Sequence, residues 1–219
     1  MAVSFDSFSS GTTPVSGTFT ISHTCAGSDR VLFVATSQAG TSVTYNGTTV
    51  TKYTDYTPST PVGTNCPPVK VFSLVNPSLG TNNISITTSG PTTVVAASYK
   101  GVPVSFNPLN NFGEHDTSNV QVATMTVGLT TTERFSWVVG FVENAGNATM
   151  AAGSGTTLRG QNVGTINSFG LAIFDNGAAV DIPALTNHTY DFSSGSGFLT
   201  AILYEVPEPQ GSGNFFPFF

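Results

Sequence analysis

The sequence predicts an all-β fold, and three observations support this. Ser and Thr are abundant, whereas charged residues, which include the helix formers Glu, Lys and Arg, make up only 8% of the 219 residues. Short apolar runs recur at intervals of roughly 8–15 residues and are separated by Gly, Pro, Asn and Ser clusters, which is typical of sandwiches and barrels. No segment keeps a helical period over about 11 residues. A mainly helical fold is therefore excluded.

The apolar runs define the expected strands in chain order. A continuous run such as 31–35 indicates a strand that is central or covered on both faces. Asn46-Gly47 predicts a two-residue hairpin between two of the strands, and Asn176-Gly177 predicts a second hairpin. The expected strands are 18–24, 30–37, 42–45, 49–53, 69–75, 83–88, 93–100, 120–127, 134–143, 168–175, 189–192 and 197–206.

An internal repeat links the two parts of the chain. The segment that starts at Thr18 resembles the segment that starts at Thr124, and the segment from Thr81 to Tyr99 aligns with that from Thr186 to Tyr204, at offsets of 104 to 106 residues. A repeat of this size means two tandem small sandwiches or one larger sandwich with two equivalent halves. We favour one two-layer antiparallel sandwich of jelly-roll type. The stretch 101–116 is expected to be the loop that crosses between the halves.

The domain organisation follows from this pattern and from the C-terminal composition. We expect an N-terminal segment at 1–17, a single sandwich at 18–206, and a Pro/Gly hinge with a Phe-rich docking arm at 207–219. Each buried Phe side chain contributes about 1.5–3 kcal/mol, so a solvated arm would favour aggregation. The arm is expected to fold back on its own sandwich or, as we favour, to insert into a neighbouring subunit. Its docking residues are Phe215, Phe216, Phe218 and Phe219.

Charge and composition exclude several classes of function. The net charge is −6 and no Lys/Arg run occurs, so no nucleic-acid site is expected. No apolar stretch reaches the ~18 residues that span a bilayer. Two cysteines outside any CxxC motif and three histidines predict no metal site and no cofactor. The N-terminus, MAVSFDSFSSGTTP, has no signal-peptide pattern, so we expect assembly inside a cell.

Residues that could support catalysis are few. No G-x-S-x-G elbow occurs, and His23 and Cys25 lie two apart, on one face of a strand, where a structural role is favoured over a Cys–His site. Cys25 and Cys66 form either a disulfide or two buried thiols. The cluster 114–116, Glu-His-Asp, is expected to be a solvated loop. We therefore predict no catalytic residues and no enzyme.

A carbohydrate platform is the alternative use of the aromatic residues. Tyr45, Tyr53 and Tyr56 surround the first hairpin and could present exposed rings to a glycan. Cross-strand packing is the competing interpretation and is favoured. Trp137 lies within an apolar run and is expected in the core.

The order of several short motifs resembles a known group of proteins. The motifs begin at His23 (HTCAGSDRVLFV), Val43 (VTYNGT), Leu74 (LVNPSLGTNNISI), Ala97 (ASYKGV) and Ala151 (AAGSGTTLR). This order is similar to β-sandwich domains of phage structural proteins and of environmental phage-like proteins. The resemblance covers about 18–206 and implies a virion-associated or surface-displayed module with no catalytic residues. The Phe-rich tail is not part of the pattern.

These observations together predict a non-enzymatic virion structural protein: a capsid decoration, spike or fibre subunit assembled in the host cytoplasm. The expected partners are sister subunits in a homo-oligomer and a major capsid or other virion protein. The alternative is a carbohydrate-binding or receptor-binding module that recognises a surface glycan, with an extracellular surface location. A jelly-roll hydrolase is the weaker alternative.

Overall fold

The computed structural model describes residues 2–37, 39–56, 66–118, 120–146, 148–163, 169–192 and 197–209. Within these ranges the chain forms antiparallel strands and one short 3-10 helix, η1 (Pro108–Asn110). The sheets pack face to face, so the predicted all-β sandwich is confirmed. No helix in the described ranges is long and apolar enough to cross a membrane.

The strands fall into two sets along the chain. The first set is β1 (Ser4–Thr13), β2 (Gly17–Cys25), β3 (Arg30–Ser37), β4 (Gly40–Tyr45), β5 (Thr48–Tyr56), β6 (Val69–Val75), β7 (Gly80–Thr88) and β8 (Thr92–Lys100). The second set is β9 (Phe112–Asp116), β10 (Thr124–Thr130), β11 (Trp137–Ala145), β12 (Met150–Ala152), β13 (Thr157–Val163), β14 (Phe169–Asp175), β15 (Leu185–Phe192) and β16 (Phe198–Val206). We call these sets the first half and the second half.

The two halves have the same strand order. The first half is one sheet, ordered β1-β8-β3-β6-β5-β4-β7-β2. The second half has the order β9-β16-β11-β14-β13 in one sheet and β12-β15-β10 in another. Each strand of the second half therefore occupies the place of the strand eight positions earlier. The sequence repeat at an offset of about 105 residues is this structural repeat, so the two halves are equivalent. Each half has its own two layers, as in the two tandem sandwiches that the repeat also allowed, and not as in the favoured single two-layer sandwich.

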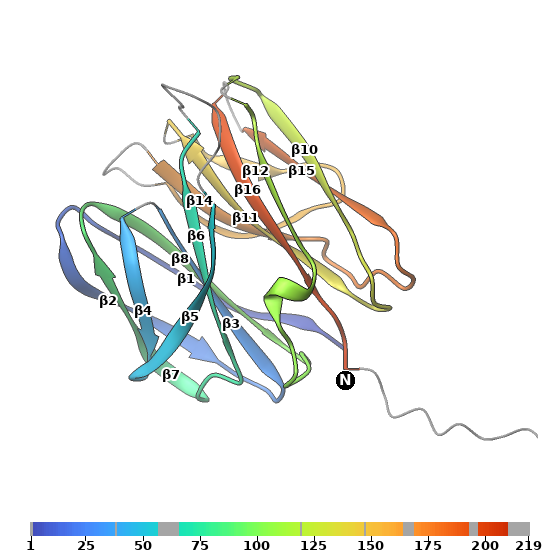
Figure 1. The fold of residues 1–219 in the computed structure, drawn as a ribbon, viewed down its shortest axis with the longest axis horizontal. Helices are drawn as coiled ribbons and strands as arrows, with labels where there is room; N and C mark the ends of the chain where they lie inside the picture. The colour runs from blue at the N-terminus through green and yellow to red at the C-terminus, as the bar shows by residue number, and fades with distance from the viewer. Residues whose placement is uncertain are drawn as a thin grey trace, which may run out of the picture.

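Each half folds into two layers, and the halves pack through their inner layers (Figure 1). The inner layers are β1-β8-β3-β6 and β9-β16-β11-β14, and a core of Val, Phe, Tyr and Trp side chains lies between them. A second core fills the first half, between β3, β6 and β8 on one side and β2, β4 and β7 on the other. A third core fills the second half, beneath β10, β12 and β15. Strands that face a core on both sides, such as β3, are buried along their whole length.

Aromatic rings dominate the core between the halves. Phe33 on β3 lies 5.4 Å from Phe141 and 5.8 Å from Tyr204, both in the second half, measured between ring centroids. Phe106, from the crossing segment, lies 6.0 Å from the same ring. Offset and edge-to-face rings at these separations stabilise a core beyond their buried area. The same ring cluster therefore joins the two halves and anchors the segment between them.

The hairpin at Asn46-Gly47 is confirmed. Tyr45 pairs with Thr48, and both turn residues have left-handed φ angles, 48° for Asn46 and 76° for Gly47, as a type I′ turn requires. The other expected hairpin, at Asn176-Gly177, is wrong, because β14 and β15 belong to different sheets. The Asn176 side chain instead accepts a hydrogen bond from the backbone N–H of Val138.

Replacing Gly47 by alanine is expected to lower the free energy of unfolding by about 1 kcal/mol. No neighbouring atom lies within 4 Å of the added Cβ, so the cost comes only from the left-handed backbone. Gly90→Ala is the control, because its φ is ordinary and its new Cβ makes an ordinary contact. Urea denaturation checks both variants, and equal losses in the two would contradict the expectation.

Four strands were not expected from the sequence: β1, β9, β12 and β13. All four lie at an edge of their sheet, and most of their residues are only half-buried or exposed. An edge strand covered on one side needs no continuous or alternating apolar run, so the signal for a strand is missing. The segment 1–17 thus supplies β1, and the stretch 101–116 contains η1 and β9 as well as a crossing loop.

Candidate functional site

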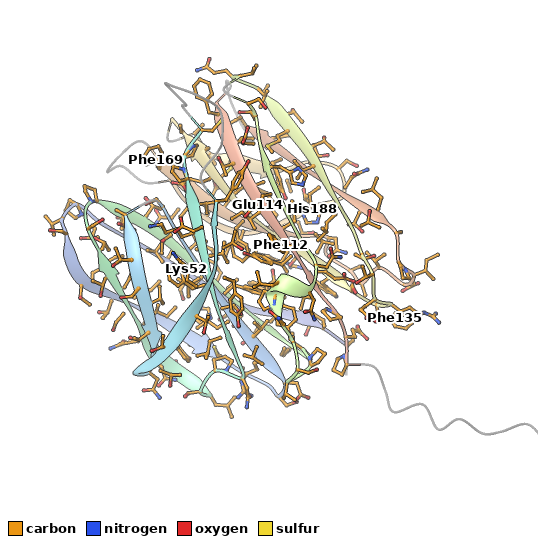
Figure 2. The ribbon with its side chains drawn as sticks, in the orientation of Figure 1. Lys52, Phe112, Glu114, Phe135, Phe169 and His188 are labelled. Atoms are coloured by element: carbon orange, nitrogen blue, oxygen red, sulfur yellow. The ribbon has the colours of Figure 1, made fainter. Side chains whose placement is uncertain are left out.

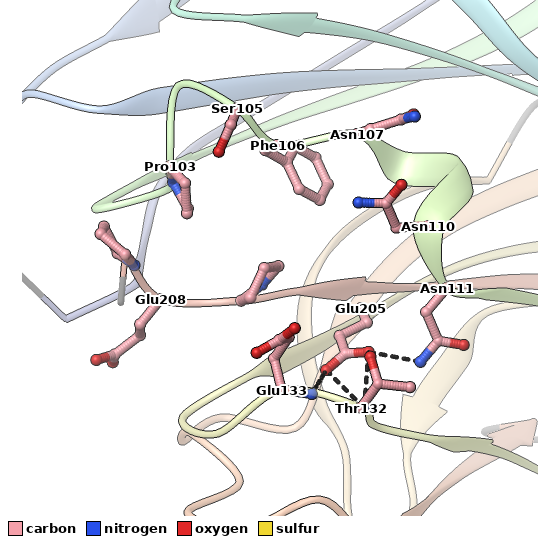
Figure 3. A pocket seen from close by; sticks show the side chains of 12 residues that line it. Pro103, Ser105, Phe106, Asn107, Asn110, Asn111, Thr132, Glu133, Glu205 and Glu208 are labelled. Atoms are coloured by element: carbon pink, nitrogen blue, oxygen red, sulfur yellow. Dashed lines mark hydrogen bonds between the residues drawn. The ribbon is translucent and has the colours of Figure 1, made fainter. Parts of the chain in front are cut away.

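A pocket of about 370 Å³ lies where the crossing segment passes the end of β16 (Figure 3). One wall comes from the crossing segment and the other from the turn that precedes β11. The last described residues of the chain form its rim. The lining residues are Pro103, Ser105, Phe106, Asn107, Asn110, Asn111, Thr132, Glu133, Glu205, Pro207, Glu208 and Pro209.

The crossing wall is fixed by local hydrogen bonds and by one buried ring. The Asn107 side chain accepts a hydrogen bond from the backbone N–H of Leu109 and caps η1, and Pro108 provides the first position of the helix, which needs no N–H donor. The backbone N–H of Phe106 donates to the Pro103 carbonyl at 2.9 Å. Because the Phe106 ring is buried in the core between the halves, this wall is anchored to that core.

The Glu205 carboxylate holds the opposite wall in place. It accepts hydrogen bonds from the Asn111 side chain and from the backbone N–H groups of Thr132 and Glu133, as Figure 3 shows. The Ser136 hydroxyl donates to it from 2.6 Å. Burial alone would raise the pKa of Glu205, but these hydrogen bonds outweigh burial and hold the pKa below its ordinary value. Glu205 is therefore an ionised structural group.

The chemistry of the pocket suits the docking of a chain segment. Phe106 and three prolines supply apolar surface, and the asparagine side chains supply donors and acceptors. Glu208 accepts a hydrogen bond from the backbone N–H of Val3 at 3.2 Å, which ties the departing chain to the N-terminal segment. Both carboxylate oxygens of Glu205 already accept hydrogen bonds from the turn before β11, so neither is free for proton transfer.

The expected docking arm adjoins this pocket. Pro207, Glu208 and Pro209 of the hinge line its rim. The docking residues Phe215, Phe216, Phe218 and Phe219 lie outside the described residues. Their role therefore stays a prediction.

The three tyrosines considered as an alternative glycan platform do not share an exposed surface. Tyr45 is completely buried, and its hydroxyl donates to the carbonyls of Ser78 and Gly80. Tyr53 is the extra residue of a β-bulge in β5 and is half-buried. The hydroxyl of half-buried Tyr56 donates to Asp116 at 2.6 Å. Cross-strand and core packing, the competing interpretation, accounts for Tyr45.

His23 and Cys25 are both enclosed, each with 1% of its surface exposed. His23 bridges Ser7 and Ser9 across the meeting edges of β2 and β1, at 3.1 and 3.0 Å. Burial lowers the pKa of His23 to about 4, against the opposing charge of Asp6. Burial also raises the pKa of the Cys25 thiol, which disfavours the reactive thiolate. The enclosure of both groups argues against the Cys–His site of a hydrolase.

The other residues considered for a disulfide or a metal site do not form one. Cys66 is buried near Thr117, and both cysteines are free thiols, so the disulfide considered between Cys25 and Cys66 is absent. The cluster at 114–116 lies on edge strand β9 and pairs with β16, so the expected loop is wrong. Among the described residues, no three His, Cys, Asp or Glu side chains are grouped as a metal site.

Two features of the structure were missed by sequence reasoning. Arg159 and Asp175 form an ion pair at the contact between the halves, and Glu143 is buried with neither carboxylate oxygen hydrogen-bonded. Arg159 lies in a polar strand without apolar alternation, so the sequence did not indicate a strand or a buried ion pair there. Glu143 could have been found, because it interrupts the apolar run of β11. Trp137, expected in the core, lies there.

Comparison with known proteins gives no match to a family model, to a curated protein or to a solved structure.

Proposed function

We propose that this protein is a non-enzymatic structural protein of a virion: a capsid decoration, spike or fibre subunit assembled in the host cytoplasm. It self-associates with sister subunits, or docks on a major capsid or other virion protein, through its C-terminal arm. The proposal is supported by the repeated strand order, by the packing of the two halves and by the surface where the arm leaves the described structure.

The repeated strand order is the observation that carries the proposal. In each half the first, eighth, third and sixth strands form the inner layer, and the fifth, fourth, seventh and second strands form the outer one. An eight-stranded jelly roll, with two Greek keys, alternates its strands between two layers in this manner, and the fold recurs in viral capsid domains. We propose that each half is a jelly roll, and that the chain is a rigid tandem of two.

The use of the buried polar groups also favours a passive building block. Arg30 is held by the carbonyls of Gly27 and Pro77 and by the Asn76 side chain, and so fixes the turn before β3. Glu205 fixes the turn before β11, the strand of the second half that corresponds to β3. These charged side chains bind backbone and stabilise turns, which is what a displayed scaffold requires.

Deleting 211–219 is expected to leave a folded sandwich that no longer assembles. The deletion removes no described residue, so far-ultraviolet circular dichroism and the thermal midpoint should match those of the full chain. Light scattering coupled to size exclusion measures the assembly. A control variant with Ser at Phe215, Phe216, Phe218 and Phe219 keeps the length of the arm and should behave like the deletion. An assembly of unchanged mass in both variants contradicts the arm.

The virion role is tested by electron microscopy of the native particle. Antibodies against the folded sandwich are expected to label the particle surface at regular positions. Purified particles that carry no label, although the protein is abundant in the infected host, would show that the protein is not a virion component.

A further inference from the structure

An exposed apolar surface lies at one end of the second half, close to the pocket. The turn before β11 and the loop before β15 run side by side there: the backbone N–H of Thr131 donates to Ala184, and that of Val180 donates to Ser136. Three large apolar side chains project into solvent from the turn, the loop and the first residue of β15: Phe135 is 39% exposed, Ile182 63% and Leu185 62%. We call these three residues the apolar tip. Figure 2 shows Phe135 at the end of the second half.

The backbone of Phe135 is strained, and the Arg134 guanidinium lies 5.1 Å from the centre of its partly exposed ring. Its φ is +57°, a left-handed value that costs a bulky residue about 1–2 kcal/mol. The turn before β3 also contains a left-handed residue, Asp29, with a φ of +52°. Asp tolerates this conformation, whereas Phe does not. The turn before β11 thus holds an exposed aromatic residue in a strained conformation, whereas the left-handed non-glycine residue in the turn before β3 is a small polar Asp, which points to a binding role.

The apolar tip continues directly from the pocket, where the described chain ends. Thr132 and Glu133 line the pocket and lie three and two residues before the tip residue Phe135. Pro207 and Pro209 line the same pocket, and ten residues, 210–219, follow them. Ten residues reach at most about 33–36 Å, so aromatic residues lie within reach of a surface next to their point of departure. The free apolar surface therefore lies near the point where the apolar segment leaves the described structure.

We propose that the apolar tip and the adjoining pocket receive residues 215–219 of a second copy of this chain. This inference rests on the proposed function, because it names the surface that receives the arm. The two prolines at 207 and 209 favour extended conformations of the residues before them. Because arm and receptor are neighbours, one two-fold axis lets two copies exchange arms and fill both receptors.

The test measures the dimer dissociation constant by sedimentation equilibrium for the full-length chain and for variants of the tip. Phe135→Asp installs a residue that tolerates the left-handed φ found at this position, so it should fold at least as well as the parent. The double variant Ile182→Ser/Leu185→Ser removes the rest of the tip. Each is expected to weaken dimerisation at least tenfold. Val15→Ser is the control, since Val15 is similarly exposed at a turn of the first half and should change nothing.

Mixing two defective chains identifies the occupant. A chain without 211–219 keeps an intact tip, and the Phe135→Asp chain keeps an intact arm, so the mixture should form a heterodimer that neither forms alone. If the arm deletion abolishes assembly while the tip variants assemble normally, the arm binds elsewhere; the inference is then overturned and the proposed function stands. A monomeric parent also overturns it. If neither the arm deletion nor the tip variants change the assembly, both proposals fail.

Discussion

Asp175→Ala is expected to lower the free energy of unfolding by about 3–5 kcal/mol. The substitution removes the buried carboxylate that Arg159 and Tyr99 contact, and so leaves the Arg159 cation without its counter-charge. The Asp175 side chain is fully buried and accepts hydrogen bonds from Arg159 at 2.6 Å, from the Tyr99 hydroxyl at 3.0 Å and from the backbone N–H of Gly177 at 2.8 Å. Arg159 also lies over the ring of Phe5 at 4.9 Å, which keeps its guanidinium near the contact between the halves. Guanidinium chloride denaturation measures the loss.

Two matched variants separate the charge from the packing. Tyr99→Phe removes one hydroxyl and should cost only about 1 kcal/mol. The double variant Asp175→Ala/Arg159→Met should be more stable than Asp175→Ala alone, since no uncompensated cation remains. If Asp175→Ala unfolds within 1 kcal/mol of the parent, the ion pair does not help to hold the halves together.

The repeat explains why this contact occurs where it does. Tyr99 and Tyr204 occupy equivalent positions, on β8 and β16, and each hydroxyl crosses to the opposite half. Tyr99 meets the charged Asp175, whereas Tyr204 donates to the hydroxyl of Thr54. The two sides have therefore diverged in chemistry while keeping the crossing geometry. Since a charge is buried on one side only, that side is the more sensitive to substitution.

The sequence predicted the strands of the interior better than those of the edges. The runs that became β3, β8, β11 and β16 are apolar on both faces, because each separates two cores. The correspondence between Tyr99 and Tyr204 was visible in the sequence repeat because both residues lie in such runs. The edge strands carry no such pattern, since solvent replaces one of their two contacts.

The candidate site was harder to predict, because it forms from segments that meet only after folding. Phe106 and Glu205 lie 99 residues apart in the sequence (205 minus 106) and line one pocket. Tyr45 shows the same limit: its position beside a hairpin allowed an exposed ring as well as a packed one. The favoured packing holds, because the ring of Tyr45 faces the core of the first half. Spacing along the chain indicates which face of a strand a residue takes, but not whether another layer covers that face.

Glu143→Met is expected to stabilise the protein, by about 1–3 kcal/mol at acidic pH and by more at neutral pH. Glu143 shares a face of β11 with the core residue Phe141, it is fully buried, and neither carboxylate oxygen has a hydrogen-bond partner among the described residues. Its cross-strand neighbours are Leu171 and Thr200, and neither carries a charge. Burial therefore raises the pKa of Glu143 well above its ordinary value of 4.5.

The pH dependence follows from the direction of that shift. When the folded pKa lies above the unfolded pKa, the unfolded chain releases its proton first, so the free energy of unfolding is fully retained below pH 4.5 and falls as pH rises toward the folded pKa. The fall is about 1.4 kcal/mol per pH unit while the folded carboxyl stays neutral. The advantage of Glu143→Met over the parent should grow with that slope between pH 5 and 7.

Two control variants accompany this test. For Glu143→Gln, the difference in free energy of unfolding from the parent should rise with pH by the same slope, but from a smaller value, because the buried amide still lacks hydrogen-bond partners. Glu133→Gln, on the exposed rim of the pocket, should show neither effect. A constant difference between Glu143→Met and the parent across this range, in urea denaturation at each pH, would mean that Glu143 is already ionised in the folded protein.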